Sequence, residues 1–382
     1  MATIKSVSKL VVDGDWIESK DQSDSGVRLI QTGNIGLGEY YDKRNKAKFI
    51  SEETFLRLKC TEVLPGDILI SRLPDPVGRA CIVPKQEEKA ITAVDCTIVR
   101  LNSDIIDSRF FLNYTQSSKY FNQLHQFLAG STRTRISRKN LEKVELPIPS
   151  LNEQRRIASI LDKVSSFISL RKQQLAKLDE LVKARFVEMF GENFDMAPLN
   201  QVCTFIDYRG KTPEKSDSGI PLITAKNVKE NSFSIEPQEF IPEENYEIVM
   251  TRGIPKVNDV LFTTEAPLGN VCRIPDVYKL FCVGQRIITM QPNKGTVTSE
   301  YLEYALRDKR FQDKMWEKSS GSTVKGIRSK LLEWLTIPVP PYGLQYNFSE
   351  FVQRADKQKL TIQQSLDKLM ILKKSLMQEY FG

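Results

Sequence analysis

Residues 146–191 read LPIPSLNEQRRIASILDKVSSFISLRKQQLAKLDELVKARFVEMFG, with neither proline nor glycine between Pro149 and Gly191. The prolines at the start favour an extended entry, because proline fixes φ and disfavours helix in the residue before it. Ser150 and Glu153 then fit a capping box, which marks a helix start. Apolar residues recur in heptads along the rest. The segment therefore predicts one long helix whose apolar seam needs a partner helix.

The partner is expected within the same chain. A shift of 191 residues lays the Gly-Ser-Thr at 130–132 on the Gly-Ser-Thr at 321–323, and Gln154 on Gln345. The same register holds without a gap to the last residue, 382, which is twice the shift. Such a match indicates an internal duplication, in which each copy is a domain followed by a long helix.

The duplication sets the expected boundaries. They are a first domain at 1–150, a first helix at 151–191, a second domain at 192–340 and a second helix at 341–382. A helix of about 38 residues is a rod of roughly 57 Å. The expected seam consists of Ile157, Leu161, Val164, Ile168, Leu175, Leu178 and Val182 on the first helix and of Phe348, Ala355, Ile362, Leu369 and Leu376 on the second. Lys359 and Lys373 interrupt the second seam.

Composition narrows the class of protein. The formal charge of +7 and a pI near 8.9 are compatible with a polyanionic partner but do not prove one. Six cysteines without a CxxC pair are read as reduced core thiols, and no apolar run approaches a membrane span. We therefore expect a cytoplasmic protein that contacts no membrane.

Each domain shows short apolar runs followed by a helical pattern. In the first domain the predicted strands are 27–30, 67–71, 80–83 and 96–101, and an aromatic helix is predicted over 108–128. In the second domain the predicted strands are 220–224 and 260–263, and the helix is 299–317. Between these landmarks the copies differ, as expected of two binding modules with different targets.

A glycine-led basic loop follows the first aromatic helix. It carries Arg133, Arg135, Arg138 and Lys139, whose side chains suit phosphate oxygens, although a solvated loop is the alternative. Arg28, Asn34, Tyr40, Arg72 and Arg79 are weaker candidates, since each alone is more often an ordinary surface residue.

Motifs for catalysis are incomplete. Gly210-Lys211-Thr212 resembles the end of a phosphate-binding loop, but Phe205 stands where that loop needs glycine. Val339 likewise replaces the polar residue that an amino-methyltransferase motif requires before Pro340. The single histidine leaves little scope for a histidine metal site or for histidine acid–base chemistry. We expect no catalytic residue, no metal and no cofactor.

Two divergent domains that alternate with two related helices resemble the specificity subunit of type I restriction–modification systems. The resemblance covers the full length and is most specific at 146–164 and 208–213. It departs from the family in the second linker, where Tyr346 and Asn347 replace Arg155 and Arg156.

The resemblance implies an α+β fold with two mixed α/β target recognition domains, two long helices packed as an antiparallel coiled coil, and a pseudo-two-fold internal repeat. It also implies that each domain reads one half of a bipartite, asymmetric target in double-stranded DNA. The expected partners are two copies of a DNA adenine methyltransferase subunit, with or without a restriction and translocation subunit. A fused enzyme and a coiled-coil scaffold are the alternatives.

The expected DNA contacts lie in both domains. They are Arg28, Asn34, Tyr40, Arg72, Arg79, Ser131, Thr132, Arg133, Arg135, Arg138 and Lys139 in the first and Tyr208, Arg209, Lys211, Thr212, Lys226, Asn227, Ser322, Thr323, Lys325, Arg328 and Lys330 in the second.

Overall fold

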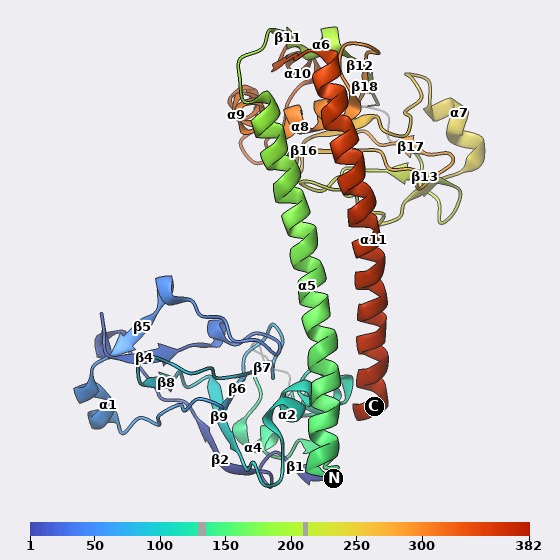
Figure 1. Ribbon diagram of the computed structural model, residues 1–382. Helices are drawn as coiled ribbons and strands as arrows, with labels where there is room; N and C mark the ends of the chain where they lie inside the picture. Colours follow the sequence, from blue (N-terminus) through green and yellow to red (C-terminus); the bar gives the residue numbers. More distant parts are fainter. Residues whose placement is uncertain (129–134, 209–212) are drawn as a thin grey trace. The chain divides into compact units, whose positions relative to one another are not determined.

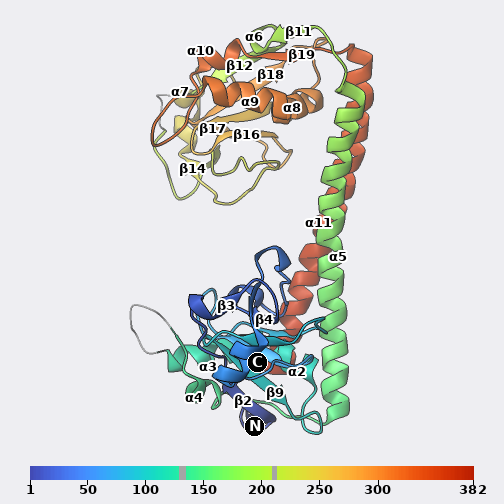
Figure 2. The same cartoon turned by 90° about the vertical axis from the view of Figure 1, so that its left-hand side faces the viewer.

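A computed structural model describes residues 1–128, 135–208 and 213–382. It divides into two compact units (Figures 1 and 2). Unit 1 comprises residues 1–172 and 364–382, and unit 2 comprises residues 173–363. Each unit therefore holds one mixed helix-and-sheet domain together with half of each long helix. The two long helices are α5 (Leu151–Phe190) and α11 (Tyr342–Phe381), as their heptads predict.

Unit 1 is built on two four-stranded sheets. One has the order β2-β9-β6-β7 and is antiparallel throughout. The other has the order β3-β5-β4-β8, in which β4 and β8 are parallel. The strands are β1 (Ala2–Thr3), β2 (Ser8–Asp13), β3 (Gln22–Ser23), β4 (Val27–Ile30), β5 (Lys48–Ile50), β6 (Ile68–Ser71), β7 (Ala80–Ile82), β8 (Ala90–Thr92), β9 (Cys96–Leu101) and β10 (Glu145–Leu146). The domain helices are α1 (Glu52–Leu58), α2 (Ser108–Tyr114), α3 (Ser118–Phe127) and α4 (Arg138–Leu141).

Unit 2 repeats this plan. Its antiparallel sheet has the order β12-β18-β15-β16, and its smaller sheet β14-β13-β17 again contains one parallel pair. The strands are β11 (Met196–Pro198), β12 (Cys203–Asp207), β13 (Ile220–Ile223), β14 (Phe240–Ile241), β15 (Val260–Thr264), β16 (Leu268–Arg273), β17 (Cys282–Val283), β18 (Ile287–Pro292) and β19 (Thr336–Pro338). The domain helices are α6 (Leu199–Val202), α7 (Tyr246–Val249), α8 (Ser299–Arg307), α9 (Lys309–Lys318) and α10 (Ser329–Glu333).

The antiparallel sheet of each unit is apolar on both faces. Along β6, Ile68 and Ile70 point into a core with the domain helices, while Leu69 points into a core with the smaller sheet. In unit 2, Phe262 on β15 points into the core with the domain helices, and Leu261 points into the core with the smaller sheet. This alternation makes three layers, in which helices and a small sheet cover opposite faces of one central sheet.

The single long helix predicted in each domain is wrong. The segment 108–128 forms α2 and α3, because Ser117 caps a new helix by accepting a hydrogen bond from the amide of Tyr120. In unit 2 Asp308 caps α9 through the amide of Arg310 and separates it from α8. A residue that prefers the N-cap position therefore starts a new helix within a segment whose apolar spacing predicts a single helix.

The start of α5 follows the sequence prediction in part. The Ser150 hydroxyl accepts a hydrogen bond from the amide of Glu153 at 3.3 Å. The Glu153 carboxylate, however, forms an ion pair with Arg156 at 2.7 Å. The reciprocal half of the capping box is therefore replaced by a helix-surface ion pair.

Opposite ends of the two long helices meet in each unit. In unit 1 the aromatic ring of Phe381, at the end of α11, lies 5.3 Å from Phe110, in a core that also contains Leu161 near the start of α5. In unit 2 the ring of Phe190, at the end of α5, lies 4.9 Å from Tyr301 and 5.4 Å from Phe348 near the start of α11. Each domain is thus closed by the start of one long helix and the end of the other.

The predicted seam residues are sheltered to different degrees. In unit 1 Ile157, Leu161 and Val164 are buried, and Ile168, Leu369 and Leu376 are half-buried. In unit 2 Val182, Phe348 and Ala355 are buried, and Leu175, Leu178 and Ile362 are half-buried.

Candidate nucleic-acid interface

Loops gather at one end of the antiparallel sheet of unit 2. The amide of Ile327 donates to the carbonyl of Thr264 at the end of β15, at 3.0 Å. Gly326 forms β-bridges with Ser320 and with Glu265. Thr264 also donates its amide to the carbonyl of Arg286, the residue before β18, at 3.0 Å. The segment that follows the second Gly-Ser-Thr is therefore fixed beside the turn that precedes β18.

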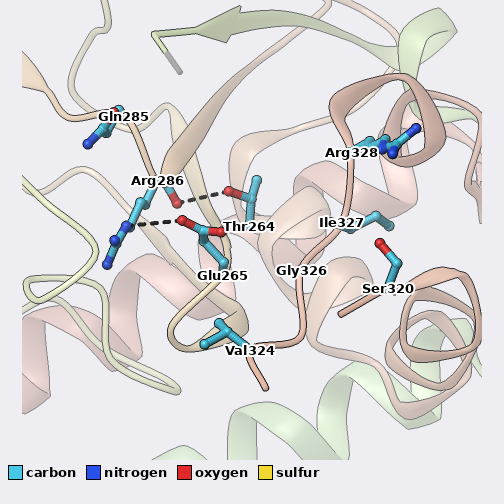
Figure 3. A pocket seen from close by; sticks show the side chains of 9 residues that line it. All are labelled: Thr264, Glu265, Gln285, Arg286, Ser320, Val324, Gly326, Ile327 and Arg328. Carbon is cyan, nitrogen blue, oxygen red and sulfur yellow. Dashed lines mark hydrogen bonds and ion pairs between the residues drawn. The ribbon is translucent and has the colours of Figure 1, made fainter. Parts of the chain in front are cut away.

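This loop cluster surrounds a cavity of about 400 Å³. Figure 3 shows Glu265 and Arg286 on one side of it and Ser320 and Arg328 on the other. The Arg286 Nε lies 3.0 Å from a Glu265 carboxylate oxygen, and both side chains are about half exposed, at 54% and 46%. Arg328 is exposed. The cavity therefore has two guanidinium groups and one carboxylate around its mouth.

A second cavity, of about 230 Å³, shares Gln285 and Arg286 with the first. Its lining includes Lys215 and Lys226, which pair with the same carboxylate, Glu239, at 2.7 and 3.0 Å. Hydrogen bonds from Lys215 and then Lys226 hold the pKa of Glu239 below its ordinary value, against the effect of burial. Two cations for one anion leave this surface positive, which suits a phosphate backbone.

Unit 1 brings the equivalent loops together. The amide of Ile136 donates to the carbonyl of Arg72 at 3.3 Å, as Ile327 does to Thr264 in unit 2. Arg135, just before Ile136, forms an ion pair with Asp95 at 3.0 Å. Asp95 precedes β9, as Arg286 precedes β18. The end of the basic loop is thus fixed beside the turn that precedes β9.

Several residues expected at the DNA surface instead have interior roles. Arg28 is 2% exposed and forms ion pairs with Asp42 and, at 3.6 Å, with Glu88. Arg72 is also buried, and it pairs with Asp13 at 3.0 Å. Guanidinium groups that are buried and paired are not available to phosphate in this conformation, so we withdraw both as proposed contacts.

Asn34 and Asn227 have the same structural role in their units. Asn34 accepts a hydrogen bond from the amide of Gln31, and Asn227 accepts one from the amide of Thr224, both at 2.9 Å. Each donates to a carbonyl seven residues ahead, Tyr41 and Ser234 respectively. Both are buried. These asparagines therefore stabilise a turn that both domains contain, and we withdraw both residues as DNA contacts.

Both candidate tyrosines lie inward. Tyr208 is buried, and its hydroxyl contacts the carbonyl of Gly253 at 2.5 Å and the amide of Arg252 at 2.9 Å. Tyr40 is half-buried, and burial raises its pKa. Among the described residues its hydroxyl has no hydrogen-bond partner. Because the Tyr40 hydroxyl and the whole Tyr208 side chain are buried, we withdraw both tyrosines as proposed DNA contacts.

Arg79 binds loop carbonyls. Its nitrogens donate to the carbonyls of Thr32, Ile35, Leu73, Pro74 and Pro76, at 2.6 to 3.2 Å. These oxygens belong to the loops after β4 and β6. Arg79 therefore positions two loops, and because carbonyls carry no net charge, its positive charge still contributes to the field of that surface.

The remaining candidates lie on the surface or outside the described residues. Arg138 is partly exposed beside Glu142, with 3.4 Å between Nε and the carboxylate. The exposed candidates are Arg135, Lys139, Lys226, Ser322, Thr323, Lys325, Arg328 and Lys330. The candidates outside the described residues are Ser131, Thr132, Arg133, Arg209, Lys211 and Thr212.

Sequence reasoning missed Glu265, Gln285 and Arg286. The signal was available, because the shift of 191 lays Asp95 on Arg286 in the turn before a matching strand. Neither a periodic apolar pattern nor a run of basic residues marks this turn in the sequence as a candidate DNA contact.

Comparisons with known proteins agree with this architecture. The family model described as type I restriction modification DNA specificity domain matches residues 1–180 and again 191–370. The chain belongs to this family.

A relative described as a putative type I restriction enzyme MjaX specificity subunit, from Methanocaldococcus jannaschii, is 23% identical over 347 residues, which are 80% of this chain and 77% of the relative. The crystal structure of a type I system S subunit from M. genitalium has a TM-score of 0.63 at 15% identity, covering 100% of this chain and 95% of the other. A chain from a study of complex assembly and conformational transition of the type I R-M system has a TM-score of 0.56 at 17% identity, covering 99% and 96%.

Specificity subunits are the non-catalytic DNA-recognition components of type I restriction–modification systems, and the function of this family member is DNA specificity. In the described part of the chain, no cluster of three or more His, Cys, Asp or Glu side chains is placed to hold a metal ion. No described helix is long and apolar enough to cross a membrane.

Proposed function

We propose that the chain reads a bipartite, asymmetric target in double-stranded DNA, one half-site with each unit. The observation that carries this proposal is the repetition of one loop cluster on two copies of one scaffold, with different side chains in the loops. Ile136 and Ile327 fix the two clusters in the same way, whereas Asp95 in one corresponds to Arg286 in the other. Equal scaffolds would present equivalent surfaces to DNA, and unequal loops would select different bases.

The long helices are proposed to pack as an antiparallel coiled coil that sets the spacing of the half-sites. The closure of each domain by the start of one helix and the end of the other supports this arrangement. Lys359 at an interrupted seam position of α11 forms an ion pair with Asp179 of α5 at 2.6 Å, within unit 2. Lys373 is half-buried and contacts Gln116 of unit 1 at 3.4 Å. Both lysines thus have partners that let them occupy a seam.

The proposed partners are two copies of a DNA adenine methyltransferase subunit, which a restriction and translocation subunit can join. Several large apolar side chains on the long helices are exposed, among them Phe167 and Leu170 in unit 1 and Leu181 in unit 2. Apolar side chains grouped on a helix surface are typical of protein contacts. Leu181 and Leu372, which are 191 positions apart, are both exposed, so part of this surface is repeated in the duplicated chain, which supports two methyltransferase copies.

Mapping of methylated bases tests this proposal. The full chain and its methyltransferase subunit are expressed together in a host that lacks adenine methylation, and the genome is sequenced for modified adenine. We expect two short, different specified blocks separated by a gap of unspecified bases. A single continuous target or a perfect palindrome would contradict the proposal that the two units recognise different half-sites.

A further inference from the structure

The turn before the last strand of the central sheet, counted along the chain, differs in charge between the two units. This turn ends with Asp95 before β9 in unit 1 and with Arg286 before β18 in unit 2. The strands that follow pair in the same way, β9 between β2 and β6 and β18 between β12 and β15. The two residues therefore occupy one position of the scaffold with opposite charges.

In unit 2 this position points a fixed guanidinium toward open space. The carbonyl of Arg286 accepts hydrogen bonds from the amide and the hydroxyl of Thr264, at 3.0 and 3.3 Å, which anchors its backbone. Its side chain lines both cavities of the loop cluster, and its Nε lies 3.0 Å from a Glu265 carboxylate oxygen. Within the described part of the chain, the Nη1 and Nη2 donors have no other partner.

In unit 1 the same position has a carboxylate that restrains a basic residue. The carbonyl of Asp95 accepts from the amide of Arg72 at 2.9 Å, so the backbone is again anchored. The side chain pairs with Arg135, and the two are 32% and 44% exposed. Here the negative charge is at the surface, and it offsets the charge of the nearest basic loop residue.

From these contacts we infer that the residue at this turn makes the phosphate contacts of the two units unequal. Arg286 contacts backbone phosphate of the half-site read by unit 2, and Asp95 makes no such contact in unit 1. The inference rests on the proposed function. The free face of a guanidinium presents two parallel donors that match phosphate oxygens. At the equivalent position Asp95 repels phosphate and holds Arg135 in an ion pair, so unit 1 forgoes the contact.

The test compares Arg286→Ala with Arg310→Ala in the full chain. Arg310 is a matched control, because it lies in unit 2, is 55% exposed and pairs through Nε with Asp308 at 2.9 Å. Binding is measured on a duplex that carries the target found by methylated-base mapping, at several salt concentrations. We expect Arg286→Ala to reduce the slope of log affinity against log salt by about one unit and Arg310→Ala to leave it unchanged.

The reciprocal change in unit 1 is Asp95→Asn. It removes the repelling charge and releases Arg135, so the slope should steepen by up to about one unit and the affinity should rise. Thermal unfolding of each variant checks that the fold is kept. If Arg286→Ala matches Arg310→Ala while the wild type protects its target, the inference is wrong and the proposed function stands. If the wild type protects no mapped target, the proposed function fails.

Discussion

At the scale of residues, one buried glutamine links each domain to its long helix. Gln154 accepts a hydrogen bond from the amide of Asp107 at 2.8 Å and donates to the carbonyls of Ile105 and Pro149. Gln345, 191 positions later, makes the same three bonds in unit 2, to Thr298, Thr296 and Pro340. Both side chains are fully buried. An amide suits this position, because its oxygen accepts one hydrogen bond while its NH2 group donates two.

Replacing Gln154 by alanine should destabilise unit 1 by about 2–4 kcal/mol, since one buried amide and two carbonyls lose their partner. The measurement is urea unfolding of the full chain. Gln358→Ala, at an exposed position of α11, is the control and should change the unfolding free energy by less than about 0.5 kcal/mol. Equal effects of the two substitutions would contradict this role of Gln154.

A buried charge cluster in unit 2 predicts acid sensitivity. Arg273 lies 2.8 Å from Glu303 and 2.6 Å from Asp356 of α11, and Arg307 also pairs with Glu303. Burial alone would raise the pKa of Glu303, but Arg307 and Arg273 outweigh it and hold the pKa below its ordinary value of 4.5. A carboxylate with a lowered pKa contributes full stability above about pH 4.5 and loses it as the pH falls through the folded-state pKa.

Glu303→Gln should therefore cost about 3 kcal/mol of stability at neutral pH, because it leaves Arg273 and Arg307 undercompensated. The difference from wild type should shrink as the pH falls from about 4.5 through the lower folded-state pKa, since the unfolded wild-type carboxylate binds a proton first and the folded one only at lower pH. Urea unfolding at a series of pH values measures both effects. Glu317→Gln, at an exposed position of α9, should show neither, and a constant cost at every pH would refute the assignment.

At the scale of elements, an aromatic residue at the end of each long helix closes a domain core. Phe381 contacts Phe110 and Tyr114 in unit 1, and Phe190 contacts Tyr301 in unit 2. The two rings are 191 positions apart and equally buried. The last helical residue of the chain is therefore part of the core of the first domain.

Phe381→Ala should destabilise unit 1 by about 3–5 kcal/mol, as expected for removing a buried ring. Thermal unfolding measures the loss. Ile371→Ala on the same helix, where the side chain is 69% exposed, is the control and should be nearly neutral. If Phe381→Ala were as mild as the control, the end of α11 would not belong to the core of unit 1.

The long helices were predictable because a seam repeated over five heptads leaves few alternatives. The domain helices were joined in error, because single capping residues such as Ser117 and Asp308 break a helix without altering its apolar spacing. Arg28 was misplaced for another reason: its partners Asp42 and Glu88 are distant in sequence, and residue type alone does not reveal pairing. The free cysteines, by contrast, are buried as expected.

At the scale of the whole molecule, two continuous helices connect the two units that are proposed to bind the half-sites. α5 and α11 each run for 40 residues and each contributes to both units. If these helices set the distance between half-sites, the length of the helices should determine the number of unspecified base pairs between the half-sites. Each residue adds 1.5 Å of helix, against about 3.4 Å for each base pair.

Methylated-base mapping of a chain with lengthened helices tests this claim most directly. Four residues, close to one helical turn, are inserted after Gln174 and after Ser365 together, so that both helices grow by about 6 Å. We expect both specified half-sites to stay unchanged and the gap between them to grow by about one or two base pairs. An active variant that methylates the target with the original gap would contradict this claim.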